Sequence, residues 1–540
     1  MNIFRLGRQY SRWIRAHAPL IYLWGALAVL LTTVFCWSLL AAHVQRQNAD
    51  QLVDGYLFEN GRTAAGAIYP ASHTQLLKWP LFALLHLCNF SVMAYDALTI
   101  LLTLATVGAL AYVLFRIVGK RPPQLGTLYL ALAAMLILVP GQVAGGATAP
   151  LNMAMLTGRN IEYPIFIGIV VCFIRAGRAR SWNFAAASLL LTVLIASDRL
   201  FVFLSLGGAA VLLTIGWWLS NRKLTTVAWR WILGSILAYL GAQVVLRLAG
   251  RFVGRIVADP APYGFITDWH KVGPALSGTA HALALNLGLS MRSGGWAIAL
   301  VAINIGIVCG MLLAARWLLA RLHGTRQHTD SAITLATALL ATTIAATAAY
   351  ASLDQPYVQN ARYLSMVLPS GFILLAVWLR GRYVYPRTAL AAASSTLLAI
   401  VLGLYGLSHA AQSPLMLQLQ VRNQHIAAAI AGHPVEYLVG DYWRVFPVRL
   451  LTKQSRQAVV PMHGCINPSQ LLTSSTWRPD VRRHSFAYIA SVTPLGGMRP
   501  CPEKQISFRY GPPSARVVIA GNSTHPQEVL LFYDNGAFSR

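Results

Sequence analysis

Charged residues are scarce in this chain, and negatively charged residues are the scarcest. Of 540 residues, 11% are charged, with 16 Asp and Glu against 43 Lys and Arg, whereas soluble domains carry about a quarter charged residues. Hydrophobic residues make up 56% of the chain and the mean hydropathy is +0.55. Apolar runs of about 20 residues recur, which is the length that crosses a bilayer core of ~30 Å. The composition excludes an ordinary soluble protein and predicts an α-helical, multi-pass membrane protein.

Cysteines are also few, and none has the spacing of a zinc site. Cys465 and Cys501 lie in the hydrophilic C-terminal region, where they would be able to form a disulfide if that region lies outside the cytoplasm. The other four lie in or beside apolar segments, as small core residues do: Cys36, Cys88, Cys172 and Cys309.

The net charge of +27 has a membrane explanation. Outside the C-terminal region, the Lys and Arg residues stand mostly in short clusters between apolar runs, which is the pattern of cytoplasmic loops. This arrangement argues against a nucleic-acid partner. Short loops and a high content of Ala and Arg are typical of a bacterial inner-membrane protein.

About eleven transmembrane helices are expected. The N-terminus is predicted inside and the C-terminus outside, because each predicted inside segment then holds three basic residues and four arginines precede the first helix. The first apolar run is too long for a typical signal peptide, so we expect it to stay uncleaved. The expected helices are 20–42, 93–116, 125–143, 161–175, 182–197, 200–219, 228–249, 295–316, 331–350, 364–380 and 388–408.

With this orientation, the acidic residues gather outside. Only Asp330 falls on the predicted inside, and the other fifteen lie in outside loops, at outside helix ends or in the C-terminal region. Asp and Glu contribute little to topology, so the bias predicts a polar site that faces outward. The longest outside loops are 43–92, 144–160 and 250–294, and we expect the stretch Thr74 to Phe90 to lie along the membrane surface.

The chain changes character near residue 411. Short runs such as 485–490 and 528–533 have the composition of strands and are separated by turn residues. We therefore expect two parts, a transmembrane domain over 1–410 and a small α/β or mostly-β domain over 411–540, outside the membrane.

Acidic residues of the first outside loop are the first candidates for chemistry. Asp50, Asp54 and Glu59 follow the first helix closely, beside aromatic residues. A carboxylate at a membrane surface can act as a general base on an acceptor hydroxyl, or bind a divalent cation. A solvated loop start is the alternative interpretation. The sequence identifies no cofactor.

Further candidates lie at other predicted outside helix ends. Arg159 and Glu162 are three residues apart and would share a helix face, near a helix N-terminus that favours anions. Asp198 and Arg199 sit in a short turn between apolar segments, where an ionisable pair is costly without partners. The alternative for Arg159 and Glu162 is an ordinary anchor pair at the membrane interface. The alternative for Asp198 and Arg199 is that the two charges neutralise each other and hold a helical hairpin together.

Cationic residues provide candidates for binding a phosphate. Arg362 opens a late helix beside Tyr363, and an Arg at that place can grip a phosphate oxygen. Lys78 and His73 add polar groups to the first loop. A lone histidine is more often a surface residue than a metal ligand, and positioning of the helix end is the alternative role for Arg362.

Taken together, this pattern resembles the GT-C superfamily of membrane glycosyltransferases, which includes protein O-mannosyltransferases, aminoarabinose transferases and arabinofuranosyltransferases. The resemblance rests on acidic residues just after the first helix, a surface helix in a long first loop, Arg362-Tyr363 with Pro369 following, and a soluble C-terminal domain. It implies a polyprenyl-phosphate sugar as donor, an outward-facing site among membrane lipids, and a glycan, lipid or protein acceptor.

The resemblance also implies roles for particular residues. Asp50 or Asp54 would be the general base, Arg362 would bind the departing lipid phosphate, and transfer would invert the anomeric carbon. Asp198 and Glu162 would orient the acceptor or a cation. Two other classes stay open: a transporter or flippase of a lipid-linked glycan, and a non-catalytic envelope assembly protein.

Overall fold

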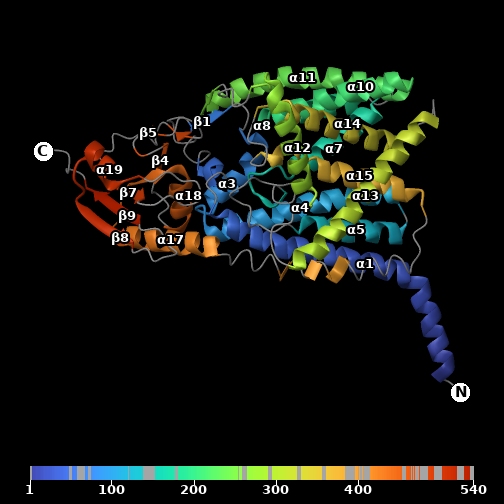
Figure 1. Ribbon diagram of the computed structural model, residues 1–540, viewed down its shortest axis with the longest axis horizontal. Coiled ribbons are helices and arrows are strands. Elements are labelled where there is room, and N and C mark those ends of the chain that lie inside the picture. Colours follow the sequence, from blue (N-terminus) through green and yellow to red (C-terminus); the bar gives the residue numbers. More distant parts are fainter. Residues whose placement is uncertain are drawn as a thin grey trace.

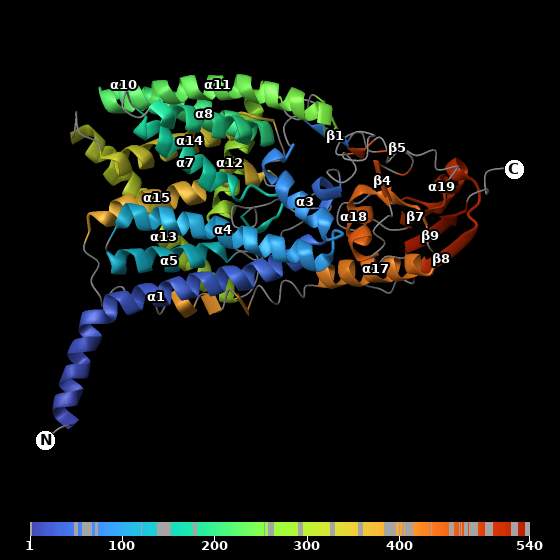
Figure 2. The ribbon, with the colours of Figure 1, turned by 180° about the vertical axis from the view of Figure 1, so that it is seen from behind.

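The protein is a helical bundle with an α/β unit beyond one end, as a computed structural model shows (Figure 1). The two views agree that long helices run side by side and that the chain's ends lie at opposite ends of the molecule (Figures 1 and 2). The residues that the structure describes are 3–47, 52–56, 67–70, 74–119, 121–137, 153–176, 181–252, 254–257, 264–289, 295–324, 330–354, 360–382, 396–398, 400–401, 404–405, 414–433, 435–452, 458–463, 465, 467–468, 473–474, 484–491, 501–519 and 528–534.

Within these ranges, seven stretches of helix are long and apolar enough to cross a membrane. Five belong to the single helices α1 (Ile3–Gln45), α4 (Val92–Val118), α11 (Arg222–Phe252), α13 (Gly295–Gly324) and α14 (Ser331–Ala351). The other two are each formed by consecutive elements: α9 (Leu200–Val202), η4 (Phe203–Gly207) and α10 (Gly208–Trp218) make one, and η6 (Ala361–Leu364) with α15 (Val367–Arg380) makes the other. The chain is therefore a multi-pass membrane protein.

The expected number of eleven spans is not confirmed. Three further expected helices exist but are short: α5 (Pro122–Leu136) has 15 residues, α7 (Glu162–Arg175) has 14 and α8 (Ser181–Ser197) has 17. A helix rises ~1.5 Å per residue, so these lengths fall below the ~20 residues that a span needs. The eleventh expected helix, 388–408, lies mostly outside the described residues.

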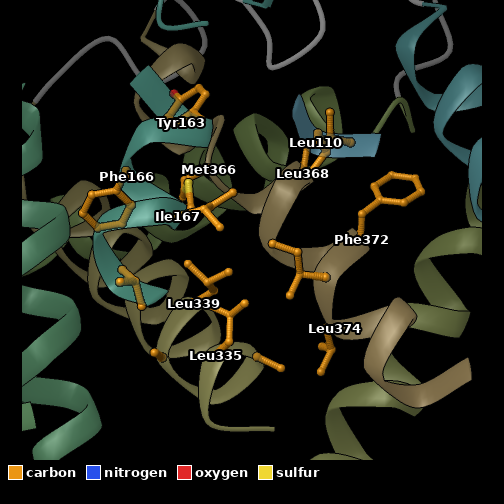
Figure 3. Close-up of a cluster of buried hydrophobic side chains, with 14 of the residues drawn as sticks. Leu110, Tyr163, Phe166, Ile167, Leu335, Leu339, Met366, Leu368, Phe372 and Leu374 are labelled. Atoms are coloured by element: carbon orange, nitrogen blue, oxygen red, sulfur yellow. The ribbon is translucent and has the colours of Figure 1, made fainter. Parts of the chain in front are cut away.

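The bundle core is apolar and closely packed. Side chains from α4, α7, α14 and α15 meet in it, among them Phe166, Leu339 and Phe372 (Figure 3). Glycine allows some helices to approach each other, as membrane helices often do. A Cβ at Gly208 would lie 2.5 Å from the Thr342 hydroxyl oxygen, so α10 can lie this close to α14 only with glycine there.

The stretch expected along the membrane surface forms η1 (Leu76–Lys78) and α3 (Trp79–Leu87). Together these two elements have 12 residues, mostly apolar, which are too few to span a membrane, in agreement with the sequence. Lys78, one of the polar groups of the first loop, lies in this stretch, and its side chain is 0% exposed. Its charge is satisfied inside the protein, as described below.

One small sheet joins three distant parts of the chain. Strand β1 (Ala67–Pro70), from the first loop, pairs in parallel with β2 (Gly254–Val257), which follows α11. It also pairs antiparallel with β6 (Thr473–Ser474) from the C-terminal region. These three segments therefore lie at the same end of the bundle, as the sequence requires if all of them are outside.

The C-terminal region contains a six-stranded mixed sheet in the order β5-β4-β3-β7-β9-β8. Strand β3 lies between β4 and β7, parallel to both, and β9 continues the sheet antiparallel to β7 and β8. The elements of this α/β unit are α17 (Pro414–Ala431), β3 (Tyr437–Asp441), α18 (Tyr442–Leu451), β4 (Ala458–His463), β5 (Asn467–Pro468), β7 (Phe486–Ser491), α19 (Glu503–Tyr510), β8 (Ala515–Ile519) and β9 (Glu528–Tyr533). The predicted domain boundary at 410/411 lies outside the described residues.

Cys465 and Cys501 form a disulfide in this unit. The bond joins the connection between β4 and β5 to the segment just before α19, and the Cys501 side chain belongs to an apolar cluster with Phe486, Tyr488 and Ile506. Disulfides persist mainly in oxidising compartments. The pair therefore agrees with the prediction that the C-terminal region lies outside the cytoplasm.

Candidate functional site

Asp54 lies on a buried turn of helix directly after the first span. All five residues of the described segment 52–56 are buried, and the Asp54 side chain is 1% exposed. A carboxylate in such a place is costly unless other charges and hydrogen bonds compensate it. The Lys78 ammonium is close enough for the Asp54 charge to stabilise it.

Lys78 is the central cation of the site. Its Nζ lies 3.1 Å from Glu162 Oε1 and donates a hydrogen bond to the Gly158 carbonyl. Burial lowers the pKa of Lys78, while the charges of Glu162, Asp54 and Asp198 act in the opposite direction. One ammonium thus interacts with three candidate carboxylates from three different segments of the chain.

A second ion pair joins Arg159 and Asp198. The Arg159 side chain is 11% exposed and that of Asp198 5%, and the other oxygen of Asp198 accepts a 2.8 Å hydrogen bond from the Leu200 amide. This amide belongs to the first turn of α9. Asp198 is therefore fixed both by a cation and by a helix N-terminus.

Tyr363 receives two guanidinium groups on its ring. The Arg159 guanidinium carbon lies 5.0 Å from the ring centroid and that of Arg362 lies 5.6 Å from it. Both distances are within the ~6 Å range of cation–π contact. Two arginines from distant segments of the chain thus contact the same ring, and a guanidinium group is well suited to bind an anion with several oxygens.

Backbone hydrogen bonds hold the loops that carry these groups. The amides of Thr74 and Gln75 both donate to the Ser197 carbonyl at 3.1 Å, and the Leu77 amide donates to the Ser197 hydroxyl at 3.2 Å. Gln75 Nε2 also donates to the Thr157 carbonyl at 2.9 Å. The segment before Lys78 is thereby fixed against the segments of both ion pairs.

The Arg362 segment is held by α12 (Val272–Asn286). Asn286 Nδ2 donates to the Ala361 carbonyl at 2.7 Å, and its Oδ1 accepts from the Ser365 hydroxyl at 3.3 Å. Asn286 is fully buried and adds a turn of α12 to the wall behind η6. The third long outside loop therefore supports the site.

The structure gathers most of the predicted residues but pairs them differently. Asp54, Lys78, Glu162 and Asp198 interact electrostatically, and Arg159, Arg362 and Tyr363 adjoin them through the contacts above. The prediction that Arg159 and Glu162 share a helix face is wrong, because α7 begins at Glu162 and Arg159 precedes it. Arg199 is partly buried beside Asp198. The predicted residues that lie outside the described part of the chain are Asp50, Glu59 and His73.

Three polar residues were missed by sequence reasoning. Gln75 and Ser197 fix the loops, and Asn160 is fully buried, with its amide donating to Glu162 Oε2 at 3.0 Å. Each lies within three residues of a candidate ionisable residue in the sequence, and this proximity is the signal by which each could have been found. Among the described residues, no three His, Cys, Asp or Glu side chains are arranged to hold a metal ion.

Comparisons with known proteins find similar structures but no similar sequence. No family model matches the chain, and no curated protein does. A crystal structure of ArnT from Cupriavidus metallidurans in the apo state matches with a TM-score of 0.41 and 13% identity, over 97% of this chain and 98% of that one. A crystal structure of the Archaeoglobus fulgidus oligosaccharyltransferase, tethered to an acceptor peptide, matches with a TM-score of 0.41 and 10% identity, over 83% of this chain and 64% of that one.

TM-scores of 0.41 do not by themselves assign a family or an activity. The ion pairs, cation–π contacts and burial described above are therefore the basis of the proposal that follows.

Proposed function

We propose that this chain is a membrane glycosyltransferase of the GT-C type that uses a polyprenyl-phosphate sugar as donor. The observation that supports this most is the gathering of Asp54, Lys78, Glu162, Asp198 and Arg159 in one buried cluster beside Arg362 and Tyr363. A base and several cations are the groups that sugar transfer from a lipid phosphate requires.

The proposed reaction is a single displacement. Asp54 accepts the proton of the acceptor hydroxyl while that oxygen bonds to the anomeric carbon. The bond from the anomeric carbon to the phosphate oxygen breaks, and the electron pair leaves with the polyprenyl phosphate. Attack opposite to the leaving group inverts the anomeric carbon.

The cations stabilise the leaving phosphate in this proposal. The guanidinium groups of Arg362 and Arg159, which both contact the Tyr363 ring, bind its oxygens, and the Lys78 ammonium adds a third positive charge. Glu162 and Asp198 hold these cations in place, because each carboxylate is paired with one of them. Fixed charges in a buried site stabilise developing charge more than water does.

The position of the charged residues favours an enzyme over a transporter. Lys78 ends η1, Glu162 begins α7, Asp198 follows α8, and Arg362 lies in η6 before α15. All four thus stand at the ends of helices, whereas a transporter is expected to carry its ionisable residues near the middle of the membrane. We place the site at the non-cytoplasmic face of a bacterial inner membrane, with a glycan, lipid or protein as acceptor.

Donor turnover by the purified protein tests this function. Wild type and the variants Asp54→Asn, Asp50→Asn and Asp354→Asn would be incubated with a panel of polyprenyl-phosphate sugars and crude envelope extract. Mass spectrometry would follow donor consumption and lipid-phosphate release. Asp354 is the matched control, because it is acidic and ion-paired but half-exposed. We expect Asp54→Asn to lose about 100-fold or more in turnover, with the control unchanged.

Two outcomes would contradict the proposal. A folded Asp54→Asn variant with wild-type turnover would remove Asp54 as the base, and loss in Asp50→Asn alone would assign that role to Asp50. If wild type consumes no donor but moves a labelled lipid-linked glycan across liposomes, the protein is a transporter.

A further inference from the structure

The α/β unit and the Asp54 segment share one apolar core. Helix α18 contributes Val445, Phe446, Val448 and Leu450 to a buried cluster that also holds Leu52, Val53 and Tyr56. These last three residues surround Asp54 in the sequence. The cluster continues into strands β3 and β9 of the sheet and into α3 and α4 of the bundle. The turn that carries Asp54 is therefore packed between the bundle and the α/β unit.

The contact centres on the ring of Tyr56. The Phe90 ring is stacked on it with centroids 4.4 Å apart, and the Phe446 ring lies 5.9 Å away at an interplanar angle of 23°. The Arg449 guanidinium carbon lies 5.5 Å from the Tyr56 centroid. We define Tyr56, Phe90, Phe446 and Arg449 as the Tyr56 clamp. Two of its members belong to α18 and one to the turn after α3.

The turn that carries Phe90 adopts an unusual backbone conformation. Asn89 and Phe90 have φ values of 52° and 48°, in the left-handed backbone region that residues other than glycine rarely adopt. Such strain persists only where the surrounding structure imposes it. Here it places the Phe90 ring over Gly55, next to Asp54.

A second set of contacts ties the α/β unit to the other side of the Asp54 segment. His43 Nε2 and Gln420 Oε1 are 3.0 Å apart, and Asn423 Nδ2 donates to Gln47 Oε1. These bonds join the end of α1 to α17. The α/β unit thus holds the chain at Gln47, before Asp54, and at Tyr56, after it.

We propose that the α/β unit positions Asp54, through the Tyr56 clamp and the α1–α17 contacts, and that Arg449 is a positioning residue for the reaction. This inference rests on the proposed role of Asp54. Catalytic geometry is sensitive to small displacements, since a misplacement of about 1 Å can lower a rate ~100-fold. The α/β unit would then act within the active site of the bundle, besides any contact it makes with the acceptor.

Variants at Arg449 test the proposal. Arg449→Met keeps much of the side-chain length but removes the cation, and Arg449→Lys keeps the charge without the planar group. Arg516→Met is the matched control, because Arg516 lies in the same unit and pairs with Glu503, away from the clamp. Two quantities would be measured: kcat and KM for the donor that wild type consumes, and hydrogen exchange of a peptide containing residues 52–56.

We expect Arg449→Met to lower kcat about 10-fold with the donor KM within twofold of wild type, and to speed exchange in the 52–56 peptide. Arg449→Lys should restore part of the lost kcat and part of the protection of the 52–56 peptide from exchange. Arg516→Met should match wild type in both measurements. Should Arg449→Met fail to fold, Phe446→Leu tests the same contact.

Unchanged kcat and unchanged exchange in Arg449→Met would overturn the inference, as would a raised KM with normal kcat. Failure of the proposed function gives a different result. If Asp54→Asn retains turnover while Arg449→Met still speeds exchange in the 52–56 peptide, the α/β unit holds this segment but Asp54 is not the base.

Discussion

Lys78 Nζ lies 3.1 Å from Glu162 Oε1, and the two side chains are only 0% and 3% exposed. This buried ion pair connects the first outside loop to the first residue of α7. Removing one partner of such a pair leaves an uncompensated buried charge, whereas replacing both by apolar groups can be nearly neutral.

We therefore expect the single and double variants to be non-additive. Glu162→Leu should destabilise the protein by about 3 kcal/mol. Adding Lys78→Met should cost less than Lys78→Met does alone, because its partner Glu162 is already gone, but the loss is not recovered in full since Lys78 also compensates the buried Asp54. Thermal unfolding in detergent would measure both. Turnover should be lost in all of them, because Lys78 belongs to the proposed site. If the double variant is destabilised by the sum of the effects of Glu162→Leu alone and Lys78→Met alone, the two residues do not interact.

The pH dependence of the enzyme should reflect Lys78. Burial lowers the pKa of its ammonium below the ordinary value of 10.5. If the protonated amine stabilises the leaving phosphate, kcat/KM falls as pH rises through this lowered pKa. Stability has the opposite sign: between the lowered pKa and 10.5 the unfolded chain binds more protons, so folding becomes more favourable as pH rises.

A pH–rate profile of Lys78→Arg checks this assignment. A guanidinium stays protonated throughout the measurable range. The alkaline fall of wild type should then disappear or move upward, even if the variant is slower. An alkaline fall at the same pH in both proteins would assign it to another group.

The cation–π contact of Arg159 with Tyr363 predicts that lysine cannot fully replace this arginine. Arg159→Lys keeps the charge and the pairing with Asp198 but loses the planar contact over the ring. We expect the donor KM to rise about 5-fold, consistent with a cation–π contact of ~1 kcal/mol. Arg380→Lys is a suitable control, since Arg380 pairs with Asp330 in an exposed place at the other end of α15. If Arg159→Lys and Arg380→Lys change the donor KM equally, the contact between Arg159 and Tyr363 does not contribute to donor binding.

The sequence indicated which candidate residues the structure brings together better than it indicated their contacts. Lys78, Glu162, Asp198 and Arg362 stand out because ionisable residues beside apolar helices are costly, and this cost is visible in one sequence. Their partners are distant in the chain, and no local spacing indicates that Lys78 meets Glu162. The proposed Arg159–Glu162 face failed because a three-residue spacing implies a shared face only when both residues lie inside the helix.

A similar division applies to the fold. The runs around 485–490 and 528–533 were predicted as strands from composition and form β7 and β9. Helix α18 was missed, because it contains Pro447 and opens with the aromatic pair Tyr442-Trp443, which are poor helix signals. That helix is stabilised by packing against the Asp54 segment, and such packing cannot be predicted from local propensity.

The disulfide between Cys465 and Cys501 should stabilise the α/β unit. It closes a loop with a sequence separation of 36 residues, for which loop-closure entropy predicts about 4 kcal/mol. Replacing both cysteines by serine should lower the unfolding temperature of the unit. Intact-mass measurement of the wild-type protein after thiol alkylation, with and without reduction, would detect the bond. Alkylation of both cysteines without reduction would contradict it.

Gly55 offers the sharpest test of the packing around Asp54. A Cβ at this position would lie 2.2 Å from Phe90 Cε2, so Gly55→Ala forces either the ring or the Asp54 turn to move. We expect kcat to fall at least 10-fold with little change in donor KM, because a displaced base slows the chemical step. Phe90→Ala removes the obstructing ring, and the double variant Gly55→Ala, Phe90→Ala should therefore be faster than Gly55→Ala alone. Gly108→Ala is the control, because its Cβ would meet no atom within 4 Å. If Gly55→Ala and Gly108→Ala are both as active as wild type, the close contact of Phe90 with this turn does not determine where Asp54 lies.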